Sequence, residues 1–213
     1  MTVNLRTYVW TNSRGAITLS VVLILIYLLE RGVAALLGFP DEIVMLSTLV
    51  VEQKRLLAAI VGPLLHRGVP HISQNLLFLL LFGGYVEWVV GWRRLYAYSA
   101  VTGYVSTWLL LFAGNAGAVG ASSITNGLQA IAGFVGLVRF IKGMSTTEDF
   151  TDLLITVLNV IPLFFGLLFA YDSIRIGMMS STGGTQAIHA LAAVVGGFLG
   201  VLYVLEQFTI RTD

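Results

Sequence analysis

The chain has 213 residues, of which 57% are hydrophobic and only 11% are charged, and its formal net charge is +1. A soluble domain carries about 25% charged residues, so the composition excludes an ordinary soluble protein and predicts a polytopic membrane protein. The small net charge and the absence of a basic run argue against nucleic acid as a partner. Because the chain has no cysteine, thiol catalysis, disulfides and cysteine metal sites are excluded as well.

Six stretches of the chain are apolar enough to span a membrane, which takes about 20 mostly apolar residues. In chain order they cover about 17–37, 72–91, 95–113, 122–141, 152–171 and 185–206. The predicted fold is therefore an all-α bundle of six transmembrane helices over 17–206, with short cytoplasmic tails at 1–16 and 207–213. The long first loop, 38–70, is expected to lie partly in the membrane interface, and the segment from Asp172 to Gly184 is predicted to be a flexible loop.

The distribution of lysine and arginine predicts the orientation, because short cytoplasmic loops carry an excess of both. Seven basic residues fall on the inner side and five on the outer side if the N-terminus is cytoplasmic. This topology sends the second, fourth and sixth helices into the membrane from outside, in what we expect to be a prokaryotic plasma membrane. His71, Ser122 and His189 then all lie near the outer edge.

Polar side chains inside a bilayer are costly and usually functional, and here they suggest a nucleophilic site. The hydroxyl of Ser122 needs a base within hydrogen-bond reach, and the candidates are His189, His71 and His66. We expect no Asp or Glu well inside a span near this edge, because Glu87 lies toward the opposite end of the second helix. The pattern therefore favours a Ser–His dyad over a triad with a buried carboxylate.

Hydrogen-bond donors accompany this pair. His71 and Asn75 are four residues apart and share one helix face, and with the N–H of Ser122 they are candidates for an oxyanion hole. The alternative is that His71 and Asn75 only hold helices together. The chain has no His-Glu-x-x-His motif, and Pro70 separates His66 from His71, so neither a metal nor a cofactor is predicted.

Other residues are predicted to have structural roles. Small residues four apart on the sixth helix, including Gly196, and on the fourth helix would allow the close approach that brings Ser122 to His189, although such ridges also occur in ordinary bundles. His66 is expected to tie down the end of the first loop, and Glu87 to bind backbone or nearby arginines.

These motifs resemble those of the rhomboid intramembrane serine proteases. The likeness lies in the run His66–Asn75 (HRGVPHISQN), in FGGYVE at 82–87, in Gly120-Ala121-Ser122, and in Gly184-x-x-x-Ile-His-x-x-Ala-x-x-x-Gly196; it covers about residues 50–200 in order and spacing. It implies a six-helix rhomboid bundle with Ser122 as nucleophile, His189 as general base, and His71 and Asn75 in the oxyanion hole. Substrates would be single-pass membrane proteins that enter laterally from the lipid, past the fifth helix, and are cleaved near the outer face.

Two residues depart from the family pattern. Ser123 stands where a glycine usually follows the nucleophile, and Asn126 where an aromatic often packs on the catalytic histidine. Asn126 is placed either to orient the imidazole or to draw it from the serine. One alternative function is therefore a catalytically inactive rhomboid-like protein that binds or escorts membrane helices. Another is an unrelated small transporter or channel, although no inverted repeat is evident.

Overall fold

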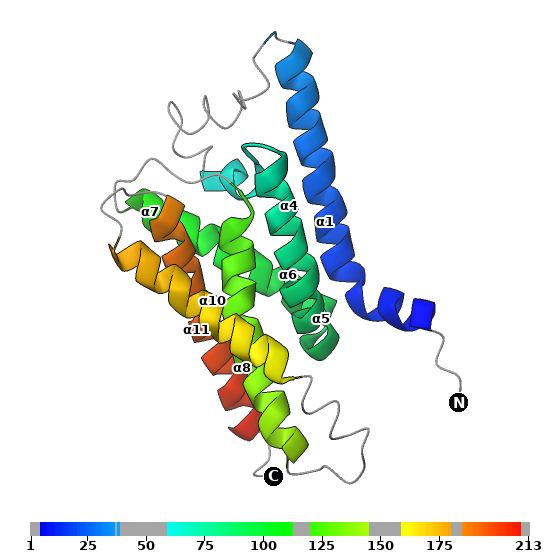
Figure 1. Ribbon diagram of the computed structural model, residues 1–213, viewed down its shortest axis with the longest axis vertical. Helices are drawn as coiled ribbons and strands as arrows, with labels where there is room; N and C mark the ends of the chain where they lie inside the picture. Colours follow the sequence, from blue (N-terminus) through cyan, green and yellow to red (C-terminus); the bar gives the residue numbers. More distant parts are fainter. Residues whose placement is uncertain are drawn as a thin grey trace.

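The protein is a bundle of membrane-spanning helices (Figure 1). The computed structural model describes residues 5–36, 38, 59–112, 120–144, 159–179 and 185–209, with the side chains of the first helix described from Ser13 on. Six helices in these residues are long and apolar enough to cross a membrane: Ser13–Leu36, Val69–Val90, Trp92–Phe112, Ser122–Gly143, Val160–Met179 and Gln186–Thr209. The predicted all-α fold with six transmembrane helices is confirmed.

The second and third spans are each divided by a π-helical turn. The second consists of α4 (Val69–Phe78), the π turn η2 (Leu79–Gly83) and α5 (Gly84–Val90); the third of α6 (Trp92–Ala100), the π turn η3 (Val101–Val105) and α7 (Ser106–Phe112). A proline in the first turn of α4 suits its start, where the missing N–H would be unpaired anyway. Gly91, with φ of 85°, is the only residue between α5 and α6, which explains why the third span begins three residues earlier than predicted.

The fifth span lies eight residues further along the chain than predicted. It is α10, Val160–Met179, whereas the sequence suggested 152–171. Asp172 and Arg175 misled the prediction, because they form an exposed ion pair one turn apart (2.8 Å) and so remain within the helix. Asn159 and Pro162 mark the start: the N–H of Leu163 donates to the carbonyl of Asn159, and Pro162 stands in the first turn.

The outer limits of the bundle also differ from the predicted tails. Helix α1 covers Leu5–Leu36 and α11 covers Thr185–Thr209, so both helices extend into the segments expected to be tails, because helical hydrogen bonding does not stop where the apolar residues do. Of the first loop, which was expected to lie partly in the membrane interface, 39–58 lie outside the described residues, and the 3-10 turn η1 (Gly62–Leu64) follows further on. The predicted flexible loop from Asp172 to Gly184 is wrong for its first part, because Asp172–Met179 belong to α10, and 180–184 lie outside the described residues.

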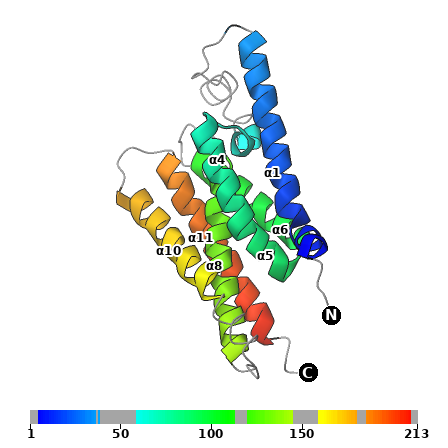
Figure 2. The same cartoon turned by 45° about the vertical axis from the view of Figure 1, so that its right-hand side comes forward.

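Helix α8 (Ser122–Met144) is the centre of the bundle, with two thirds of its span buried. Figure 2 shows α10 and α11 beside it, with α4, α5 and α1 on its other side. A Cβ on Gly196 of α11 would overlap the carbonyl oxygen of Gly127 and lie 2.7 Å from its Cα, and a Cβ on Gly166 of α10 would lie 2.6 Å from the N atom of Gly133. The three helices therefore pack backbone to backbone, as small residues permit in lipid.

Replacing Gly196 by alanine should test this packing. The new Cβ would meet backbone atoms of Gly127, which cannot rotate away, so α8 and α11 must separate. We expect a loss of about 1–3 kcal/mol in unfolding free energy and a larger loss of any activity that needs both helices. Thermal unfolding in detergent measures the loss of stability. Gly197→Ala is the matched control, because its Cβ would lie 3.8 Å from Phe134; equal stability of the two variants would contradict this packing.

A buried carboxylate ties α1 to α5. Glu87 is 3% exposed and accepts hydrogen bonds from the backbone N–H groups of Gly15 (2.7 Å) and Ala16 (2.8 Å). In a straight helix these donors would pair within α1, and Figure 1 shows the beginning of α1 turned away from the rest. Glu87 thus binds backbone, one of the two roles expected for it.

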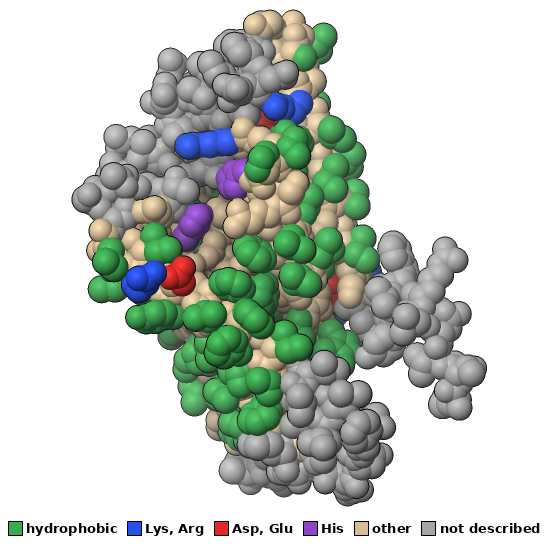
Figure 3. Space-filling view, viewed as in Figure 1, with side chains coloured by type: hydrophobic (Ala, Val, Ile, Leu, Met, Phe, Trp, Pro, Cys, Tyr) green, Lys and Arg blue, Asp and Glu red, His purple; other side chains and the backbone are tan. Residues whose placement is uncertain are grey.

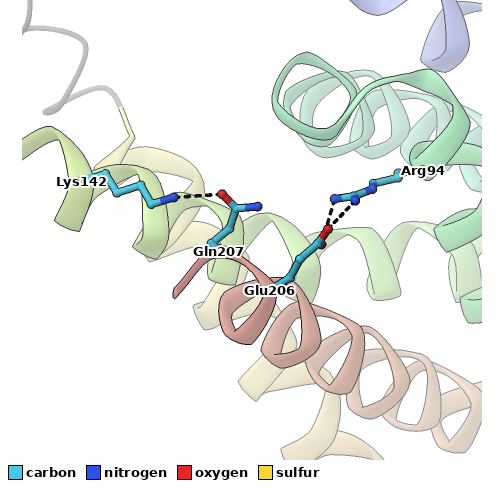
Figure 4. A network of polar contacts seen from close by, with 4 residues as sticks. All are labelled: Arg94, Lys142, Glu206 and Gln207. Atoms are coloured by element: carbon cyan, nitrogen blue, oxygen red, sulfur yellow. Dashed lines mark hydrogen bonds and ion pairs between the residues drawn. The ribbon is translucent and has the colours of Figure 1, made fainter. Parts of the chain in front are cut away.

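Polar contacts join three helices at the end of α11 (Figure 4). Arg94 of α6 forms a bidentate ion pair with Glu206, at 2.6 and 3.0 Å, and Lys142 of α8 donates to Gln207 at 2.9 Å. These residues are partly exposed, so the contacts set the register of α11 more than they stabilise it.

Candidate active site

Ser122 and His189 meet where α8 and α11 begin. Ser122 is the first residue of α8 and is 7% exposed. His189 lies in the second turn of α11, and its Nε2 is 2.8 Å from the Oγ of Ser122, although the two residues are 67 positions apart in the chain. In the described part of the chain, the hydrogen bonds of His189 include no carboxylate. The arrangement can therefore act as a two-residue nucleophile and base.

His71 packs against the turn that precedes the serine. Gly120 has φ of +116°, which favours glycine, and its N–H donates to the carbonyl of Gly62 at 2.7 Å. A Cβ on Gly120 would lie 2.7 Å from the Nε2 of His71 and would also strike its Cε1. A glycine is thus required at position 120 both for the backbone conformation and for the close contact of the turn with the His71 ring.

Asn75 has a buried donor without a partner and lies beside the first turn of α8. It is 3% exposed, its Oδ1 accepts a long hydrogen bond of 3.5 Å from the hydroxyl of Thr125, and its Nδ2 has no hydrogen-bond partner. Because unpaired buried donors are costly, such a group suggests a ligand or a role in chemistry. An amide N–H in this position can stabilise an oxyanion.

His66 and the carboxylate of Glu30, from α1, support the turn that precedes Ser122. His66 is fully buried; its Nε2 accepts from the N–H of Ala121 at 3.4 Å, and its ring contacts that of His71 edge-on, with centroids 5.3 Å apart. The N–H of His66 donates to Glu30, also at 3.4 Å. His66 therefore supports the nucleophile turn in addition to the first loop.

Glu30 corrects the expectation that no acidic residue lies inside a span near this edge. It belongs to α1 and is 2% exposed. The sequence signal was present, because Glu30 falls inside the first predicted span, 17–37. Glu30 contacts the backbone N–H of His66, so it does not join the contact between Ser122 and His189.

Acid is expected to destabilise the protein through His66. Burial, and next the neighbouring His71, lower the pKa of His66 from 6.5 to about 4. Between these values the unfolded chain binds more protons than the folded one, so stability is complete above pH 6.5 and is lost as the pH falls toward 4. The loss should amount to about 1–3 kcal/mol.

The measurement is the thermal unfolding midpoint between pH 4.5 and 7.5 for wild type and His66→Gln. The difference between the two proteins should change below pH 6.5 and be constant above it. A difference that stays constant over the whole range would show that His66 does not titrate on unfolding.

The two departures from the family pattern have different environments. Ser123 is fully buried and its hydroxyl has no hydrogen-bond partner. Asn126 donates from Nδ2 to the carbonyl of Ser122 at 2.7 Å and accepts at Oδ1 from the hydroxyl of Ser173 at 2.6 Å. Ser173 was not singled out from the sequence, because nothing in its neighbourhood distinguishes it from other serines in polar segments.

An apolar groove of about 390 Å³ lies between the second and fifth spans. Phe78 and Phe82 contribute from one side and Phe165 and Phe169 from the other. Two ring contacts connect these sides, Phe78–Phe169 at 5.7 Å and Phe82–Phe169 at 6.0 Å, and the hydroxyl of Tyr85 donates to Asn159 at 2.7 Å. The groove is open on one side, with Phe165 43% exposed.

The site can be reached from the surface. His71 and His189 are both partly exposed, and Figure 3 shows histidine side chains on the face of the molecule above a band of hydrophobic ones.

Of the residues singled out from the sequence, six come together at this site: Ser122, His189, His71, Asn75, His66 and Gly120. Glu87 and Gly196 lie elsewhere in the bundle, in the contacts with α1 and α8 described above.

These features define a polytopic membrane protein with a serine–histidine pair at one end of a six-helix bundle. The chain belongs to the rhomboid family: the model of the Rhomboid domain matches residues 53–208. The match includes α4 to α11, apart from the last residue of α11, and does not include α1. A comparison with curated proteins gives no match.

Proposed function

We propose that this rhomboid-family protein is an intramembrane serine endopeptidase in which Ser122 is the nucleophile and His189 the general base. The observation that carries the proposal is the 2.8 Å contact between the Oγ of Ser122 and the Nε2 of His189. The packing of apolar helices does not by itself require a serine and a histidine to be in contact. Polar groups placed in lipid are usually functional.

The chemistry follows from the geometry. His189 takes the hydroxyl proton as Ser122 attacks a peptide carbonyl, and the developing oxyanion accepts hydrogen bonds from Asn75, His71 and the N–H of Ser122. The last of these is a free donor at a helix N-terminus. The proton then passes to the leaving amine, and a water molecule, deprotonated by His189, hydrolyses the acyl-enzyme and restores the serine. No metal or cofactor enters these steps.

Substrates of this enzyme are single-pass membrane proteins that enter sideways from the lipid. The apolar groove between α4–α5 and α10 supports this route, because its aromatic lining suits a hydrophobic helix. The proposed orientation has both termini in the cytoplasm and the site open to the outside, since seven basic residues fall on the inner side and five on the outer side in that topology. The membrane is proposed to be a prokaryotic plasma membrane.

A fluorophosphonate probe tests the proposal without a known substrate, because it reacts with activated serines. The detergent-solubilised wild type should be labelled, whereas Ser122→Ala and His189→Ala should not. Labelling that persists in Ser122→Ala would place the reactive serine elsewhere. An unlabelled wild type with a normal unfolding transition would disprove an active dyad.

The second candidate is an inactive rhomboid-like protein that binds or escorts membrane helices. The observation in its favour is Asn126, which replaces the aromatic often found on the catalytic histidine and directs its hydrogen bonds to Ser122 and Ser173. This candidate predicts a folded, unlabelled protein that still retains single-pass proteins on co-purification.

A further inference from the structure

Asn126 connects the nucleophile to another helix through both ends of its amide. It lies one turn after Ser122 on α8, and its Nδ2 donates to the carbonyl oxygen of Ser122 at 2.7 Å. Its Oδ1 accepts from the hydroxyl of Ser173, on α10, at 2.6 Å. A continuous path of two short hydrogen bonds thus runs from α10 to the backbone of the proposed nucleophile.

We infer that Asn126 and Ser173 form a positioning pair: Ser173 orients the amide of Asn126, and the amide holds the first turn of α8 so that Ser122 stays aligned with His189. The inference rests on the proposed function of Ser122. It makes α10, which borders the apolar groove, a helix whose position affects the reactivity of the serine.

The behaviour of Ser173 supports a dedicated contact. Serine and threonine inside helices usually donate to the carbonyl one turn earlier on the same helix, and in this chain Ser20, Thr107 and Thr209 do so. Ser173 instead donates across to α8. The hydroxyl therefore contributes to the pairing of two helices.

The two hydrogen bonds also determine which end of the Asn126 amide is the oxygen and which is the nitrogen. With Ser173 donating to Oδ1, the NH₂ group must be the end that faces the carbonyl of Ser122. Both polar atoms of the amide are then engaged away from His189, so Asn126 does not compete with Ser122 for the imidazole. Without Ser173, the amide can rotate, and the competition becomes possible.

Close glycine contacts join α8 and α10 further along their length. A Cβ on Gly166 would lie 2.6 Å from the N atom of Gly133, and a Cβ on Gly136 would lie 2.8 Å from the N atom of Leu163. These contacts hold the helices together about three to four turns along α8 from Ser122. Removing the Ser173 hydroxyl should therefore change alignment at Ser122 while leaving the packing of α10 intact.

The experiment measures the rate at which a fluorophosphonate probe labels Ser122, with unfolding midpoints recorded for each variant. Ser173→Ala should be labelled about two- to tenfold more slowly than wild type, as expected for the loss of one hydrogen bond. Ser173→Thr, which keeps the hydroxyl, should restore the rate. Asn126→Leu, close in shape but unable to hydrogen-bond, should be slowed at least as much, and adding Ser173→Ala to it should cause no further loss.

Ser106→Ala is the matched control, because Ser106 is a buried serine on α7 whose hydroxyl has no hydrogen-bond partner; its labelling rate should equal that of wild type. A normal rate in Ser173→Ala, or additive losses in the double variant, would overturn the inference. So would a lower midpoint with a normal rate, since this would show a purely structural contact. An unlabelled wild type would instead refute the proposed function, and the inference with it.

Discussion

Ser122→Ala and His189→Ala are each expected to abolish proteolysis, lowering the rate by a factor of about 10⁴ or more. Each change removes one half of the 2.8 Å contact, and members of such a unit lose most of the activity when either is removed. The measurement is cleavage of a tagged single-pass protein reconstituted with the enzyme in lipid vesicles, followed on gels over time.

A buried serine outside the site provides the control. Ser99 on α6 is 3% exposed and its hydroxyl has no hydrogen-bond partner, so Ser99→Ala should cleave at the wild-type rate. The double variant of Ser122 and His189 should be no worse than either single variant. Cleavage by Ser122→Ala at more than a few per cent of the wild-type rate would rule out Ser122 as the nucleophile.

Asn75→Ala should lower kcat by about 10²–10³, the usual cost of one oxyanion donor. The Nδ2 of Asn75 is buried without a partner in the free protein, so its hydrogen bond is made only when an oxyanion forms. KM should change little, because a bond confined to the transition state affects kcat and kcat/KM equally. Steady-state cleavage of the same tagged protein in vesicles separates the two constants.

Stability distinguishes this role from the alternative that Asn75 only holds helices together. Removing an unpaired buried donor should leave the unfolding midpoint close to that of wild type, since only the 3.5 Å bond from Thr125 is lost. The neighbouring Gln74 is exposed, and Gln74→Ala should alter neither constant. A lower midpoint with an unchanged kcat would assign Asn75 to helix pairing alone.

The number and order of the spans could be predicted from the sequence because hydropathy and helix starts are local properties. Pro70 and Gly91 predicted both limits of the second span to within a few residues, and six apolar stretches predicted six helices. The predicted limits of the fifth span were wrong, and the reason was also local. Asp172 and Arg175 suggested a loop, but their charges compensate one another within the helix, and Asn159 with Pro162 marked the true start.

The contact partners of individual side chains were harder to predict from the sequence. The sequence could place Ser122, His71, Asn75 and His189 at one edge, since alternating helices return to the same side of the membrane. It did not suggest that Glu30 contacts His66 or that Ser173 contacts Asn126. Nothing local marks these pairs, which lie 36 and 47 residues apart.

Composition and periodicity were thus sufficient for the membrane class, the six helices and the edge that holds the polar residues, because each depends on interactions among neighbours in the chain. The tertiary structure was needed for the 2.8 Å contact of Ser122 with His189, the free donor of Asn75 and the amide bonds of Asn126. These depend on how closely the helices cross at Gly127 and Gly196 and on how each is rotated about its axis. A shift of one ångström there would break the hydrogen bonds while leaving every local pattern in the sequence unchanged.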